Sequence, residues 1–199
     1  MSVVNLNSIR KKISSSNKLK TTSEKVANKA FNKSKNQFLE EFNSHPITKE
    51  LEEGPEGSNL SNTLGGIGNL FSFIGFYKTD KPIDEVRSFF DKSFSLEKGK
   101  NVNVKPNSIQ YNFKIKYPNL QELKGETPMP WEGGKSWISS IERGISGFSF
   151  YMYKKFGEGR SGEGLQTNSK IRPGNYKPVR YISEIINNFL KNLTKWKQA

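Results

Sequence analysis

The sequence predicts an α+β fold: a small, mostly antiparallel sheet packed by a long C-terminal helix, with an N-terminal helix and an extended basic arm. The clearest helix is the last one, because apolar residues recur at helical spacing through residues 182–196. The clearest strand covers residues 108–117, where apolar and polar residues alternate strictly. Helices and strands follow one another without a fixed repeat, so we expect a single α+β domain over residues 22–199.

The N-terminal region is strongly basic. Residues 1–35 contain nine lysine and arginine residues against the single Glu24, and we expect residues 1–21 to form a flexible basic arm. A helix is expected from Thr22 onward, with Thr22 or Ser23 as its cap. One face of that helix carries residues three or four apart, namely Ala27, Phe31, Ser34, Phe38 and Phe42. This face is narrow, so the helix is expected to pack lightly on its own domain or to dock on another surface.

The next part of the chain predicts two short helices. Residues 40–56 are acidic, and their helical turn is expected to end at Gly54 and Pro55. A glycine-rich loop is expected over residues 54–69. Residues 80–94 predict a helix that Asp80 caps and Pro82 begins. Its buried face is expected to contain Ile83, Val86, Phe90 and Phe94.

Two strands and two helices are expected toward the C-terminus. One face of the strand at 108–117 carries Ile109, Tyr111, Phe113, Ile115 and Tyr117. A proline-rich loop, a short helix that stops at Gly144 and a second strand are expected over 125–134, 135–145 and 147–156. A glycine-rich loop over 157–175 precedes the last helix. The buried stripe of that helix is expected to contain Ile182, Ile185, Ile186, Phe189, Leu193 and Trp196.

An uncharged, apolar stretch, LGGIGNLFSFIGF, occupies residues 64–76. It is shorter than the roughly 18 residues of a membrane span, and it lacks the lysine and the following helix of a phosphate-binding loop. We therefore expect it to be extended and buried against protein. It is either a core strand entered through a glycine turn or a segment that docks on a neighbouring subunit, and both can hold. The candidate interface residues are Leu70, Phe71, Phe73 and Phe76.

The formal net charge is +13, which indicates an acidic partner or a compositional bias without a partner. The basic arm could bind nucleic-acid phosphates without reading bases, lie on an acidic protein surface, or be solvated. The candidate partner-contact residues of the arm are Arg10, Lys11, Lys12, Lys18 and Lys20. The chain has no cysteine, which excludes disulfides, thiol catalysis and zinc fingers. Its single histidine, His45, cannot build a multi-histidine metal site.

Sequence motifs for catalysis are weak or missing. GEGRSG at 157–162 matches a dinucleotide fingerprint by its letters, but the residues after it do not predict a helix. Glu142 lies among aromatic residues and could be a buried acid with a raised pKa, or could pair with Arg143 or Arg180. No phosphate-binding loop, metalloprotease or hydrolase motif occurs. We expect no enzyme activity, no cofactor and no metal site.

The layout of the chain resembles the small neck and tail-completion proteins of long-tailed bacteriophages. Three segments carry the resemblance: the lysine-rich N-terminal helix, the turn WISSIERGIS before a strand, and GRSGEGLQ leading to the terminal helix KPVRYISEIINNFLKNL. It covers residues 22–195 as a pattern of elements. The glycine-rich loop and residues 95–107 make this chain longer than a minimal family member.

The resemblance implies a virion structural protein that forms or joins a ring between the capsid portal or its adaptor and the tail tube. The implied partners are portal adaptor, tail tube or tail terminator proteins and neighbouring subunits of the same ring. It implies assembly in the bacterial host cytoplasm, a final location in the virion neck or tail, and no membrane contact. The alternative is a non-specific nucleic-acid-binding protein that uses the basic arm.

Overall fold

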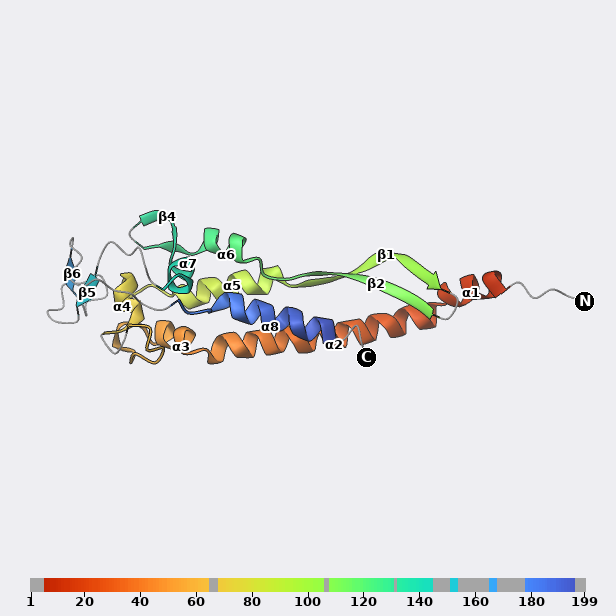
Figure 1. Cartoon of the computed structure of the whole chain (residues 1–199), viewed down its shortest axis with the longest axis horizontal. Coiled ribbons are helices and arrows are strands. Elements are labelled where there is room, and N and C mark those ends of the chain that lie inside the picture. The colour runs from red at the N-terminus through yellow and green to blue at the C-terminus, as the bar shows by residue number, and fades with distance from the viewer. Residues whose placement is uncertain are drawn as a thin grey trace, which may run out of the picture.

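The computed structural model describes residues 6–64, 68–105, 108–130, 132–144, 151–153, 165–167 and 178–195. These residues form an elongated molecule with two parts (Figure 1). The stalk consists of helix α1, residues 17–35 of helix α2 and the hairpin of strands β1 and β2. The body contains the remaining described elements, some alongside the C-terminal half of α2 and others beyond its end.

The described helices are α1 (Leu6–Ser14), α2 (Asn17–Ser44), α3 (Pro46–Glu53), the 3₁₀ turn η1 (Gly54–Glu56), α4 (Leu70–Ile74), α5 (Pro82–Ser93), α6 (Leu120–Glu126), α7 (Trp137–Glu142) and α8 (Ile182–Lys195). The described strands are β1 (Ser95–Lys105), β2 (Ser108–Lys116), β3 (Pro128–Met129), β4 (Glu132–Ser136), β5 (Tyr151–Tyr153) and β6 (Leu165–Thr167).

The predicted flexible arm is helical over most of its length. Residues 6–14 and 17–21 lie in α1 and α2, so the prediction of a flexible arm over 1–21 is wrong for them. Lysine favours helices, and the local hydroxyl groups are satisfied inside the helix. The hydroxyl of Thr22 donates to the carbonyl of Lys18 at 2.8 Å, so Thr22 does not cap the helix. The chain leaves helical conformation only around Ser16, between α1 and α2.

The core is built around aromatic rings from α2. The buried residues of α2 are Ala30, Phe31, Ser34, Phe38 and Phe42, which confirms most of the predicted face. The ring of Phe38 meets Phe90 of α5 and Phe189 of α8 edge-on, with centroids 4.9 and 6.1 Å apart. Such edge-to-face pairs each contribute about 0.5–1.5 kcal/mol beyond their burial. Three helices are thereby joined at one point.

The C-terminal helix packs along α2, as Figure 1 shows. Its buried residues are Ile182, Ile185 and Phe189, in agreement with the predicted stripe; Trp196 lies outside the described residues. Polar contacts at the edge of this packing set its register. The amide of Asn188 donates to Glu41 at 3.1 Å, and that of Asn192 donates to Gln37 at 3.3 Å.

The β1–β2 hairpin is antiparallel and runs alongside the N-terminal half of α2 (Figure 1). The alternation predicted for β2 is confirmed, because its apolar residues are half-buried and its polar residues exposed. β1 was not predicted, since its lysine, asparagine and glycine residues disfavour strands; pairing with β2 imposes the conformation. A Cβ atom on Gly99 would lie 2.7 Å from the carbonyl oxygen of Asn112, so glycine is required where the register shifts.

The described strands form three separate two-stranded antiparallel sheets rather than one. β3 and the first residues of β4, which pair with each other, lie in the predicted proline-rich loop 125–134, and β5 pairs with β6. Helix α6 was not predicted, whereas α7 lies where a short helix was expected and ends before Gly144. The α+β class is confirmed, with the antiparallel pairs small and the C-terminal helix long.

Helix α5 confirms the predicted buried face, with Ile83, Val86 and Phe90 in the core and Pro82 in its first turn. Asp80 does not cap it. The carboxylate of Asp80 instead accepts a hydrogen bond from the backbone N–H of Tyr77 at 2.7 Å, which tightens the turn before the helix.

Within the stretch at 64–76, residues 70–74 form a short helix, α4, so the predicted extended conformation is wrong for them. The side-chain oxygen of Asn69 caps its start by accepting from the N–H of Ser72 at 2.8 Å. The carboxylate of Glu50, fully buried, accepts from the N–H of Leu70 at 2.6 Å. Gly75 ends the helix with a φ of 89°, a left-handed conformation that favours glycine.

Asn69 also holds the preceding turn in place. Its amide donates to the carbonyl oxygens of Gly54, Pro55 and Gly57 at 2.9, 2.7 and 3.1 Å. One buried side chain therefore forms hydrogen bonds with backbone groups at the start of α4 and around η1. A local sequence pattern does not reveal such a contact.

We expect Asn69→Ala to destabilise the protein by about 2–3 kcal/mol, because it removes a helix cap and leaves buried carbonyls without a donor. Asn69→Asp keeps the cap acceptor but places a carboxylate against three carbonyl oxygens, so it is also expected to destabilise. Urea unfolding measures both. The control is Asn36→Ala on the exposed face of α2, with an expected change within about 0.5 kcal/mol. If Asn69→Ala unfolds with the same urea midpoint as the wild type, the stabilising role of Asn69 is contradicted.

Candidate functional site

The stalk carries nearly all of the net charge of the chain. By sequence, residues 6–35 and 95–116 contain fourteen lysine and arginine residues and two glutamates, a net charge of +12 against +13 for the whole chain. These segments are far apart in sequence but lie side by side (Figure 1). The hydroxyl of Tyr111 in β2 donates to the carbonyl of Ser14 at 3.2 Å, which ties the hairpin to the end of α1.

Both glutamates of the stalk are already paired. Glu24 of α2 forms an ion pair with Lys98 of β1, and Glu97 pairs with Lys116 at 3.5 Å. No other carboxylate belongs to these segments. The exposed basic residues that remain are Lys11, Lys12, Lys18, Lys25, Lys29, Lys33, Lys105 and Lys114. Their mutual repulsion is screened only by salt, over a distance of about 10 Å at 0.1 M ionic strength.

The stalk also leaves large apolar side chains exposed. Ile13, Leu19, Val26 and Val104 are 40–61% exposed. An isolated two-stranded hairpin is marginally stable in water, and here the apolar face of β2 is only half-buried. The stalk therefore offers both charge and apolar area to a partner. In the body most large apolar side chains are buried, with Leu60 and Tyr77 exposed at 45 and 51%.

The structure separates the two sets of residues that the sequence singles out. Arg10, Lys11 and Lys12 lie on α1, and Lys18 and Lys20 at the start of α2, all within the stalk. The candidate interface residues Leu70, Phe71 and Phe73 belong to α4, which lies far from the stalk (Figure 1), and Phe76 follows shortly after that helix. They are only 0, 1, 7 and 5% exposed. This burial agrees with the core alternative, and in this conformation the four side chains offer little surface to a neighbouring subunit.

Sequence reasoning missed the contribution of the hairpin to this surface. Lys98 and Lys105 lie on β1, a segment not expected to be a strand. The alternation of polar and apolar residues in β2 does place Lys114 and Lys116 on one polar face, so their position on that face could be predicted from the sequence. Nothing in the linear sequence brings the hairpin beside α2.

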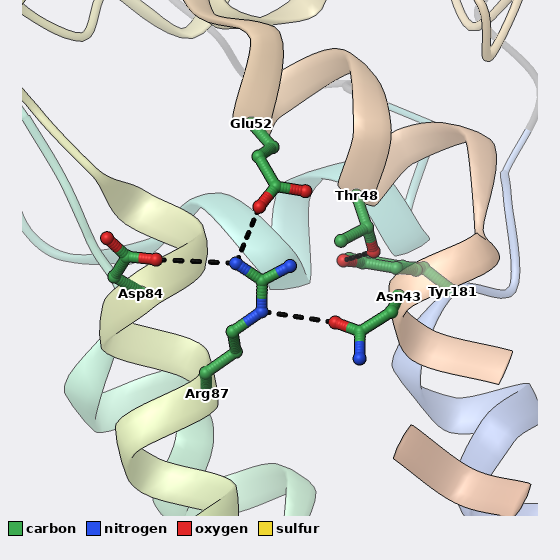
Figure 2. Close-up of polar contacts among 6 residues, drawn as sticks. All are labelled: Asn43, Thr48, Glu52, Asp84, Arg87 and Tyr181. Atoms are coloured by element: carbon green, nitrogen blue, oxygen red, sulfur yellow. Dashed lines mark hydrogen bonds and ion pairs between the residues drawn. The ribbon is translucent and has the colours of Figure 1, made fainter. Parts of the chain in front are cut away.

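The strongest polar cluster of the body is centred on Arg87 (Figure 2). Its guanidinium donates to Glu52 at 2.7 Å and to Asp84 at 3.3 Å, and its Nε donates to Asn43 at 3.1 Å. Hydrogen bonding to Glu52, above all, raises the pKa of Arg87. The cluster joins α2, α3 and α5, and its geometry is that of a structural clamp.

Beside this clamp, the hydroxyls of Tyr181 and Thr48 share a 2.6 Å hydrogen bond (Figure 2). Burial raises the pKa of Tyr181. His45 stacks near the Tyr181 ring at a centroid distance of 4.7 Å, and its Nδ1 accepts from the N–H of Ile47, which caps α3. Burial lowers the pKa of His45, and nearby Glu184 partly opposes this effect.

The candidate acid Glu142 has a structural contact. Its carboxylate accepts a hydrogen bond from the N–H of Ser183 at 2.7 Å, at the start of α8, where the helix dipole favours negative charge. The motif at 157–162 lies outside the described residues. Among the residues described, no cluster of histidine and acidic side chains could hold a metal ion.

A groove of about 840 Å³ lies between α5, α6 and α8. Its lining includes Phe89, Leu120 and Ile186. Glu122 is the one acid among its described lining residues, so paired carboxylates for acid–base chemistry are not found there. No helix of the described chain is both long and apolar enough to cross a membrane.

Comparison with protein-family models, with curated proteins and with solved structures found no match to this chain. Within the described residues, the stalk combines a high positive charge with exposed apolar side chains.

We expect the stability of the protein to fall as pH drops from about 7.5 to about 5.5, in part through His45. Its pKa is lower in the folded state, so the unfolded chain binds the proton first and acid favours unfolding. His45→Asn keeps a good helix cap without a titrating ring. Urea unfolding at both pH values should show a smaller loss for this variant. Equal losses in the two proteins would contradict the role of His45.

Proposed function

We propose that this chain is a non-catalytic structural protein of a bacteriophage neck or tail, which forms or joins a ring between the capsid portal or its adaptor and the tail tube. The observation that supports an assembly role is the division of the molecule. The body has its own core, whereas the stalk exposes lysines and large apolar side chains. A subunit that is completed by its neighbours is expected to have such a part.

The stalk is suited to contact with an acidic neighbour. Charge complementarity steers association and fixes the register of partners, and a net charge of +12 on one part of the molecule supplies the basic side of such a contact. The exposed Leu19 and Val26 are seven residues apart on α2 and so lie on the same side of the helix. They offer apolar area that a protein partner would bury.

The assignment to a phage neck or tail comes from the resemblance in chain layout. The proposed partners are the portal adaptor, the tail tube or terminator and neighbouring copies of the same chain, and the proposed location is the virion after assembly in the host cytoplasm. The contacts that hold Glu142 and Arg87 in structural roles are compatible with a protein that performs no chemistry.

A tagged pull-down from the producing cells tests this proposal. The extract is treated with nuclease and washed in high salt, which removes contacts made through phosphates. Portal, adaptor or tail proteins that stay bound under these conditions support the assembly role. Loss of every partner, with nucleic acid recovered only from an untreated low-salt control, would overturn it.

We expect deletion of residues 1–20 to leave the body folded and to block incorporation into particles. The deletion removes α1 and the first residues of α2, while the buried residues of α2 begin at Ala30. Circular dichroism and thermal unfolding check the fold, and immunoblots of purified particles check incorporation. A control with Lys49→Ala and Lys81→Ala in the body should be incorporated normally. Normal incorporation of the truncated chain would contradict the role of the N-terminal region.

A further inference from the structure

Four lysines form a stripe along the outer face of α2. Lys18, Lys25, Lys29 and Lys33 are all exposed and are separated by seven, four and four residues. At 100° per residue, the first three fall within a sector of about 40°, and Lys33 lies about 40° beyond it, so the four span about 80°. The axial separations are about 10, 6 and 6 Å. We call these four residues the lysine stripe.

The lysine stripe points away from the rest of the molecule. The residues of α2 buried against other elements include Phe31, Ser34 and Phe38. By helix geometry they lie about half a turn from Lys18, Lys25 and Lys29. Among the described residues, no carboxylate pairs with any lysine of the stripe. The stripe is thus an exposed row of like charges that the fold does not neutralise.

The exposed apolar residues Leu19 and Val26 lie about a quarter turn from Lys18 around α2. The composition of the lysine stripe itself favours a phosphate backbone over a protein surface. Protein interfaces are depleted in lysine and enriched in aromatic residues. Within residues 17–36 the one aromatic residue is Phe31, which is buried on the other side of the helix. Protein–nucleic acid interfaces, in contrast, are strongly positive. Asn32 and Asn36 are exposed on the same side as the stripe, and amide groups commonly donate to phosphate oxygens.

We propose that the lysine stripe binds the phosphate backbone of nucleic acid without reading its sequence. Lysine is a point charge on a flexible stem, so a row about 6–10 Å apart can follow successive phosphates without a fixed geometry. The lack of an exposed aromatic residue in the stripe removes base stacking, the main source of affinity for single strands. Double-stranded DNA has one charge per roughly 1.7 Å of axis, twice the density of one strand. Duplex DNA should therefore bind more tightly than single-stranded DNA of the same sequence.

The test uses the purified full-length chain and a fluorescent 30-base-pair duplex of random sequence, with anisotropy measured over a series of salt concentrations. The stripe variant carries Lys18→Gln, Lys25→Gln, Lys29→Gln and Lys33→Gln. Glutamine has a similar helix propensity, and loss of like charges four residues apart does not weaken a helix. The matched control carries Lys49→Gln, Lys81→Gln, Lys92→Gln and Lys191→Gln. These four residues are exposed in the body, and the change in net charge is the same.

We expect the stripe variant to lose at least about tenfold in affinity near 0.1 M salt, and its salt slope to fall by up to about 3.6, or 0.9 for each phosphate contact. The control should stay within about twofold of the wild type. Equal losses of affinity in both variants would mean that binding depends on net charge alone, and would overturn the proposal that the lysine stripe is the binding site. Retained binding in the stripe variant, or no binding by the wild type, would also overturn it.

A competitor distinguishes the chemistry of the partner. Poly-glutamate matched to the duplex in total charge is titrated against the bound complex at the same salt concentration. Displacement only at a large excess supports phosphate recognition. Displacement at an equal charge concentration would overturn the nucleic-acid assignment in favour of an acidic protein surface. These measurements are independent of particle assembly, so their failure leaves the proposed virion role standing, and failure of the pull-down leaves the stripe testable.

Discussion

The packing of Phe38 and Phe42 against rings from α5 and α8 positions the rest of the molecule. Phe42 meets Phe90 at a centroid distance of 4.9 Å and stacks near Tyr181 at 6.1 Å, while Phe38 meets Phe94 at 5.1 Å. Because these rings come from helices that are distant in sequence, the cluster closes the body around the C-terminal half of α2. The N-terminal half of α2 then has to leave the body as an exposed helix, and the stalk is the consequence.

The stalk stays ordered without a core of comparable size. Its buried residues are few, and its charges repel one another. What holds it is continuity with α2, the ion pair between Glu24 and Lys98, and the hydrogen bond from Tyr111 to the end of α1. An exposed ion pair contributes only about 0–1 kcal/mol. Binding to a polyanion or to an acidic neighbour would therefore stabilise the stalk, because it relieves repulsion as well as adding contacts.

The elements that the sequence predicts are those whose burial is periodic. The stripe of α8, the face of α2 from Phe31 to Phe42 and the alternation in β2 each repeat over several turns or residue pairs, so the pattern is visible without knowledge of neighbours. Helix α4 has five residues, too few for a period, and it depends on Asn69 and on the distant Glu50. β1 depends on its partner strand in the same way.

The candidate site shows the same division. The lysines of α1 and α2 are obvious as a cluster in the sequence, but their joining with the lysines of the hairpin is a tertiary fact. The apolar character of Phe71 and Phe73 does not by itself distinguish burial within the fold from contact with a neighbour, and the structure shows the burial. An apolar segment is most simply buried within its own fold, and here Asn69 caps the short helix that carries the buried Phe71 and Phe73.

Because α2 continues without a break from the stalk into the core, a movement of the stalk also moves the part of α2 in the core. Its 28 residues span about 42 Å, and the aromatic cluster around Phe38 and Phe42 lies near its C-terminal end. A small tilt imposed on the stalk by a bound partner would turn the Phe38 ring against Phe90 and Phe189, whose close packing resists gradual deformation. A force on the charged end of α2 would thus be transmitted to the body. Binding of a partner to the stalk is thereby coupled to the side-chain packing of the body.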